Sequence, residues 1–65
     1  MSDLNLSPNI TDPDGFYAEL LAVHHGLSLE DSQSLNARLV LILANHIGDR
    51  AVLRAALSAA KGAST

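Results

Sequence analysis

Apolar residues recur at intervals of three and four along three stretches of the chain, and this spacing predicts three helices. The first stretch covers residues 13–25, the second covers 29–47 and the third covers 50–61. No stretch alternates apolar and polar residues as a half-buried strand would. We therefore expect an all-α fold, either a small three-helix bundle or an open helical array, over residues 12–61.

Residues that cap helices mark the predicted boundaries. Asp12 can cap the first helix, and it is followed by Pro13, a residue favoured at the first helical position. Ser28 and Asp49 stand in the same place before the second and third helices. A glycine follows each helix, where a left-handed residue commonly ends the helical run. These signals make short joints between the helices the simplest prediction.

The two ends of the chain lack the helical pattern. Residues 1–11 are expected to form a flexible polar arm, because Pro8 interrupts regular structure and its neighbours favour a turn. Residues 62–65 read Gly-Ala-Ser-Thr and are expected to fray. Neither end is expected to add to the core.

The second helix has the widest apolar arc and is the expected centre of the fold. At about 100° per residue its large apolar side chains cover much of its circumference. They are Leu29, Leu35, Leu39, Val40, Ile42, Leu43 and Ile47. If this helix packs against both neighbours, Leu39→Ala or Leu43→Ala should cost about 2–5 kcal/mol of folding free energy.

Composition places the chain near the limit of independent folding. It has 65 residues, no cysteine and 3% aromatic residues. Disulfides and thiolate metal sites are thereby excluded as sources of stability. A domain of about 60 residues buries only about 60% of the surface of its unfolded chain. We expect a protein that is marginally stable alone or stabilised by a partner.

Charge is distributed unevenly along the chain. Six acidic and no basic residues precede position 32, whereas four basic residues and Asp49 follow it, so the halves carry −6 and +3 and the chain −3. This balance argues against nucleic acid as a partner. Arg50, Arg54 and Lys61 share a narrow strip of the third helix. The strip is either a solvated face or a docking surface for an acidic partner.

The second helix departs from its own pattern at two places. Leu41 falls on the polar side between Ala37 and Ala44, where it is either simply exposed or part of a seam for another helix. His46 lies within the apolar arc near the helix end. There, together with Asn45, it either holds the connection to the third helix through hydrogen bonds or faces a partner's polar group. The expected partner-binding residues are Ala37, Leu41, Ala44, Asn45, His46, Arg50 and Arg54.

Groups that could carry catalysis are sparse. Serines fall at caps and polar faces, acids fall mostly at helix starts, and no glycine-rich phosphate loop is present. We expect no catalytic residue, no cofactor and no enzymatic activity. His24 also lies on an apolar arc and could meet His46 in a bundle, but no third metal ligand accompanies the pair. A weak histidine-based metal or ligand module is one alternative, and His25 should be solvated.

The chain shows no targeting signal. Its start has no basic segment followed by an apolar one, as a signal peptide would. The longest apolar run, from Leu39 to Ala44, is far shorter than the roughly 20 residues that span a bilayer. We expect a cytoplasmic protein without a membrane partner.

Three segments of the sequence resemble a known family: DPDGFY with the following GLS at 12–17 and 26–28, LNARLVLILANHIGD at 35–49, and AVLR at 51–54. In the middle segment, Asn36, Arg38, Asn45 and His46 are not residues that a generic amphipathic helix requires. The resemblance covers about residues 9–60 and is to family 2783 of the domains of unknown function, which are short bacterial proteins. It implies no activity and no site residue. Members occur beside flavin-dependent oxidoreductases of aromatic-compound breakdown, which implies a small accessory subunit by association alone.

These observations favour a small helical accessory protein that binds and stabilises or regulates a partner enzyme. The resemblance suggests a flavin-dependent oxidoreductase as that partner. The alternative is a self-associating homodimer without catalytic role, in which the Leu41 seam meets its own copy across a two-fold axis.

Overall fold

Three helices and no strand make up the part of the chain that the computed structural model describes, residues 3–62. They are α1 (Pro13–His24), α2 (Leu29–Ile47) and α3 (Arg50–Gly62). The predicted all-α class is confirmed. Two ends differ from the prediction: α1 stops one residue earlier, and α3 continues through Gly62, which the sequence assigned to the tail. Residues 1–2 of the predicted arm and 63–65 of the predicted tail lie outside the described range.

Side-chain caps begin all three helices, as the sequence predicts. The Asp12 Oδ1 atom accepts a hydrogen bond from the Gly15 amide at 3.1 Å, and the Ser28 hydroxyl accepts one from the Asp31 amide at 3.1 Å. The Asp49 carboxylate accepts from two amide groups in the first turn of α3, at 2.9 and 3.2 Å. These bonds satisfy N–H groups that no helical carbonyl can reach.

The cap of α1 has an unusual backbone conformation. Asp12 has φ 53° and ψ 66°, in the left-handed region, whereas a helix cap is ordinarily extended. The turn brings its carboxylate so close to Gly15 that a Cβ atom on that glycine would overlap it. Glycine at position 15 is therefore part of the cap.

Glycines in the left-handed conformation make both joints. Gly26 has φ 80° and Gly48 has φ 73°. The Gly48 amide donates to the Ala44 carbonyl at 2.9 Å, which closes the end of α2. Within the described residues this bond and the Asp49 cap hold the joint, and no side-chain bond from Asn45 or His46 stitches it, contrary to one of the two expectations for that pair.

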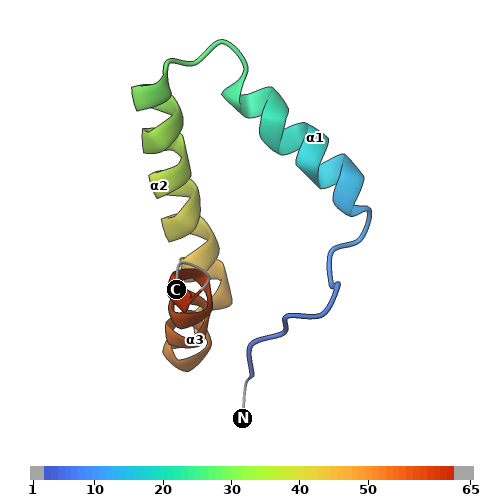
Figure 1. Cartoon of the computed structure of the whole chain (residues 1–65), viewed down its shortest axis with the longest axis vertical. Coiled ribbons are helices and arrows are strands. Elements are labelled where there is room, and N and C mark those ends of the chain that lie inside the picture. Colours follow the sequence, from blue (N-terminus) through green and yellow to red (C-terminus); the bar gives the residue numbers. More distant parts are fainter. Residues whose placement is uncertain (1–2, 63–65) are drawn as a thin grey trace.

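The helices form an open array. Figure 1 shows α1 and α2 diverging from their connecting loop like the arms of a V, with α3 seen nearly end-on at the carboxyl end of α2. Residues 3–11 run without helix from the start of α1 toward the open end of the V. The radius of gyration is 13.6 Å, whereas a compact domain of this length has about 11 Å. Of the two predicted arrangements, the array is therefore the one observed.

No described residue is buried, so the predicted core does not exist within one chain. The half-buried helical side chains gather in two places. Leu20 and His24 of α1 lie opposite Ser32, Leu35 and Leu39 of α2. The others are Ala44 of α2 and Val52, Leu53 and Ala56 of α3, on two helices that contact each other. Leu43, predicted to be a core residue, is 47% exposed. Since truncation costs several kcal/mol only where a side chain is enclosed, the predicted cost of Leu43→Ala does not apply to a single chain.

Candidate functional site

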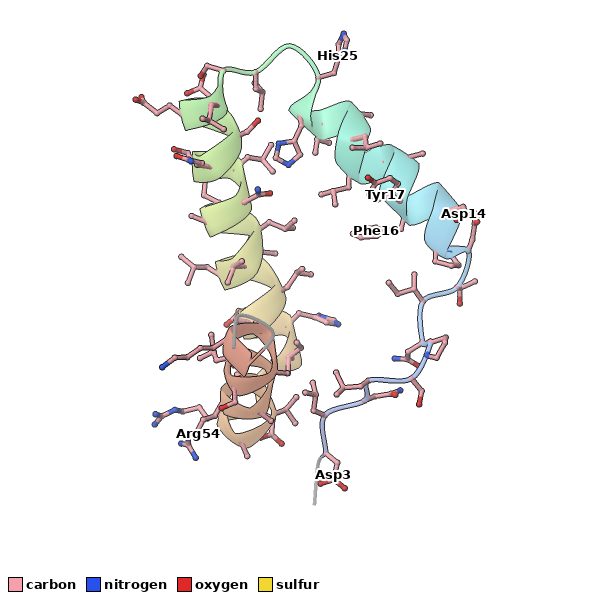
Figure 2. All side chains as sticks on the ribbon, viewed as in Figure 1. Asp3, Asp14, Phe16, Tyr17, His25 and Arg54 are labelled. Atoms are coloured by element: carbon pink, nitrogen blue, oxygen red, sulfur yellow. The ribbon has the colours of Figure 1, made fainter. Side chains whose placement is uncertain are left out.

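An apolar cleft of about 350 Å³ lies between the arms of the V. Both arms contribute large apolar side chains, and one charged residue from each arm joins them. The lining residues are Phe16, Glu19, Leu20 and Val23 of α1 and Leu35, Arg38, Leu39 and Ile42 of α2. Figure 2 shows Phe16 projecting from α1 toward α2. Because all of these residues come from two helices, the cleft has two walls and is open away from the connecting loop.

A histidine bridge closes the narrow end of the cleft. The Nε2 atom of His24 lies 3.0 Å from Asn36 Oδ1, and its Nδ1 atom lies 3.0 Å from Ser32 Oγ. An amide oxygen only accepts, so the Nε2–H group donates to Asn36. The sequence placed His24 on an apolar arc with His46 as its suggested neighbour, and it assigned no contact to Asn36 or Ser32. Ser32 and Asn36 lie one turn apart on α2, and this spacing is the signal that could have suggested a common polar partner for them.

The two histidines that the sequence suggested as neighbours, His24 and His46, lie apart. His24 is bonded to the first half of α2, whereas His46 is about 15 Å further along the helix axis at about 1.5 Å per residue. A histidine pair is therefore not formed in this chain. Among residues 3–62, no group of three or more potential metal ligands comes together. His25, expected to be solvated, is exposed and points away from both helices (Figure 2).

The five predicted partner-binding residues that belong to α2 divide between two of its faces. Ala37, Leu41 and Ala44 follow one another at helical spacing on a stripe that does not line the cleft. We call this stripe, with the adjacent Asn45, the outer seam. His46 lies instead in line with the cleft residues, four and seven positions after two of them. Leu41 is 70% exposed, whereas Ala44 is half-buried.

The basic residues of α3 lie beyond the cleft. Arg50 and Arg54 are both exposed and are one turn apart. Figure 2 shows Arg54 extending to the side of the molecule that faces away from α1. The structure thus keeps these cations out of the apolar cleft and presents them to solvent.

The chain belongs to the family described as Protein of unknown function (DUF2783), whose model matches residues 4–62. The resemblance expected from the sequence is thereby confirmed, and it extends slightly beyond both predicted ends. No curated protein and no solved structure matches the chain. Within residues 3–62, none of the helices has the length and apolar character needed to cross a membrane.

Proposed function

We propose that this protein is a non-catalytic helical subunit that binds a partner enzyme through the outer seam of α2 and the basic residues of α3. The observation that carries the proposal is the distribution of apolar side chains around α2. Leu35 and Leu39 line the cleft, while Leu41, about 200° around the helix from Leu39, is 70% exposed. A helix whose large apolar side chains extend beyond the face covered by its own chain commonly contacts another protein.

The chain itself supplies too little cover for such a helix. Val40 is 62% exposed and Ile47 is 51% exposed, and neither lines the cleft. Filling the cleft would leave these side chains and Leu41 in water. Contiguous apolar surface outside a cleft commonly marks a protein interface.

Small and basic residues define the kind of surface that would fit. Ala37, one turn before Leu41, lets another backbone approach α2 closely, while Leu41 provides an apolar anchor. Arg50 and Arg54 add positive charge nearby, which would steer and orient an acidic surface. The matching partner surface is an apolar groove with an acidic rim.

The family resemblance gives the first partner to test. An enzyme of the flavin-dependent oxidoreductase class, taken from the chromosomal neighbourhood of the coding sequence, should be titrated with the purified protein. Binding should weaken in Leu41→Glu and Arg54→Glu, and it should fall with added salt because exposed charges are screened. Tyr17→Glu is the matched control, since Tyr17 is 60% exposed on α1 and lies outside the proposed surface.

Affinity purification of the tagged protein from its native host extends the test to other enzymes. A partner recovered by the parent chain and by Tyr17→Glu, but lost with Leu41→Glu, supports the proposal. A partner that all three chains retain equally would remove the outer seam from the interface.

A further inference from the structure

We propose that the α1–α2 cleft is filled by the α1–α2 cleft of a second copy, so that two open Vs form one closed dimer. The inference concerns a different face from the outer seam and goes beyond the proposed partner binding. It rests on three properties of the described chain: surplus surface, the composition of the cleft walls and the charges at its edge.

The surface area of the chain is too large for a folded monomer of its size. It exposes 5754 Å², whereas a compact protein of 6.8 kDa exposes about 4,000 Å². The surplus is about 1,800 Å² per copy, or about 3,600 Å² for a pair, which falls in the range of about 2,000–5,000 Å² for obligate homodimers. The surplus of two copies is therefore large enough to supply a dimer interface at the cleft and still leave the outer seam exposed.

The cleft walls have the form that a second V would match. Each arm presents three large apolar side chains at helical spacing, Phe16, Leu20 and Val23 on one and Leu35, Leu39 and Ile42 on the other. A small ligand would need convergent polar groups to fix its orientation, and this cleft offers only one charge on each wall. Two such helix pairs stacked face to face give a four-helix core in which the α1 wall of each copy meets the α2 wall of the other.

A second copy also explains why the cleft lacks further walls. In a two-fold arrangement the same patch occurs on both partners, so each copy covers the cleft of the other at once. A single helix from another protein would also cover the cleft, but the faces of that helix that point away from the cleft would still need cover of their own. The open V is then half of a core, and the second half has the same sequence.

The charges at the cleft edge fit this pairing. Glu19 lines the cleft from α1 and Arg38 lines it from α2. Both are exposed, and within the described residues neither has an ion-pair partner. When the Vs stack with their loops at the same end, α1 of each copy runs antiparallel to α2 of the other. Glu19 of each copy then faces Arg38 of the other, which gives two equivalent ion pairs.

Sedimentation of the full chain over micromolar to millimolar concentrations tests the proposal. We expect a monomer–dimer equilibrium. Glu19→Arg and Arg38→Glu should each weaken the dimer by at least about tenfold, since each places two like-charge pairs across the interface. The double variant Glu19→Arg/Arg38→Glu should restore it. Because both positions are exposed, helix content measured by circular dichroism should stay unchanged in all three variants.

Leu41→Glu serves as the matched control, since the outer seam lies outside the proposed dimer interface. It should leave dimerisation unchanged while reducing binding of the partner enzyme. A chain that stays monomeric at every concentration would overturn the cleft dimer. So would a dimer that Leu41→Glu abolishes and the charge reversals leave intact, which would assign self-association to the outer seam. Either result can occur whether or not partner binding succeeds, so the two proposals fail separately.

Discussion

The Nε2 atom of His24 lies 3.0 Å from the Oδ1 atom of Asn36, and this hydrogen bond joins the last turn of α1 to α2. The other ring nitrogen of His24 lies 3.0 Å from the Ser32 hydroxyl, so a single imidazole is held at two points one helical turn apart. Such a two-point contact fixes the direction in which α1 leaves the loop. We expect the opening of the V, and with it the shape of the apolar cleft, to depend on this bridge.

His24→Ala should loosen the angle between α1 and α2. It removes both hydrogen bonds of the bridge, each of which contributes about 1 kcal/mol. Spin labels at Ala18 of α1 and Ser34 of α2 should report a broader distance distribution, and the thermal midpoint should fall. His25→Ala is the control, because that neighbouring ring points away from both helices (Figure 2). Equal distance distributions in both variants would show that the loop backbone, rather than the bridge, sets the angle.

The sequence predicts the helices of this protein much better than their arrangement. Caps and glycines act within a few residues, so Ser28 and Gly48 suffice to place both ends of α2 correctly, and Asp49 places the start of α3. Arrangement depends on what covers each apolar arc, and the arcs of α1 and α2 look the same in a closed bundle and in an open V. The sequence therefore identified the residues of the cleft as core residues, such as Leu39, while the chain leaves them at an open surface.

The candidate site was harder to predict because it depends on relations between helices. Leu41 stands out within its own helix, since an exposed leucine breaks the local pattern. The bridge residues His24, Ser32 and Asn36 gain their meaning only when two helices meet. A polar residue on an apolar arc indicates that a polar partner exists, but it does not say on which helix.

Asp12→Ala should destabilise α1 by about 1–2 kcal/mol, because it removes the side-chain cap and places a residue with a poor left-handed preference at φ 53°. Asp12→Asn keeps both the capping oxygen and the tolerance of left-handed backbone. We expect it to preserve the helix content that Asp12→Ala loses, as measured by far-ultraviolet circular dichroism during urea titration. If both variants lose helix equally, the negative charge and not the hydrogen bond is the stabilising feature.

Alanine substitutions at three glycines should change the free energy of unfolding in different directions, according to the backbone conformation of each glycine. Gly26→Ala and Gly48→Ala each force a Cβ atom into the left-handed region and should cost about 1 kcal/mol. Gly62→Ala, within the last turn of α3, has open space around its new Cβ and no such backbone conflict. It should stabilise the chain slightly through higher helix propensity. Thermal unfolding of the three variants checks this order, and a destabilised Gly62→Ala would contradict it.

Leu39→Ala should lower the free energy of unfolding by an amount that grows with protein concentration. In a single chain Leu39 is half-buried beside an open cleft, so truncation should cost less than about 1 kcal/mol, whereas enclosure in a dimer raises the expected cost to about 2–5 kcal/mol. Mass action makes the dimer contribution rise with concentration. Urea unfolding of the parent chain and Leu39→Ala, each at two concentrations on either side of the dimer midpoint, measures the difference.

Leu57→Ala is the control for that experiment. Leu57 is 70% exposed on α3 and does not line the cleft, so its truncation should cost little at both concentrations. A Leu39→Ala cost that is large already in the dilute sample would mean that one chain encloses this side chain by itself. A cost that stays small in the concentrated sample would mean that the second copy does not reach the α2 wall of the cleft. Only a rise confined to Leu39→Ala is consistent with a core shared between two copies.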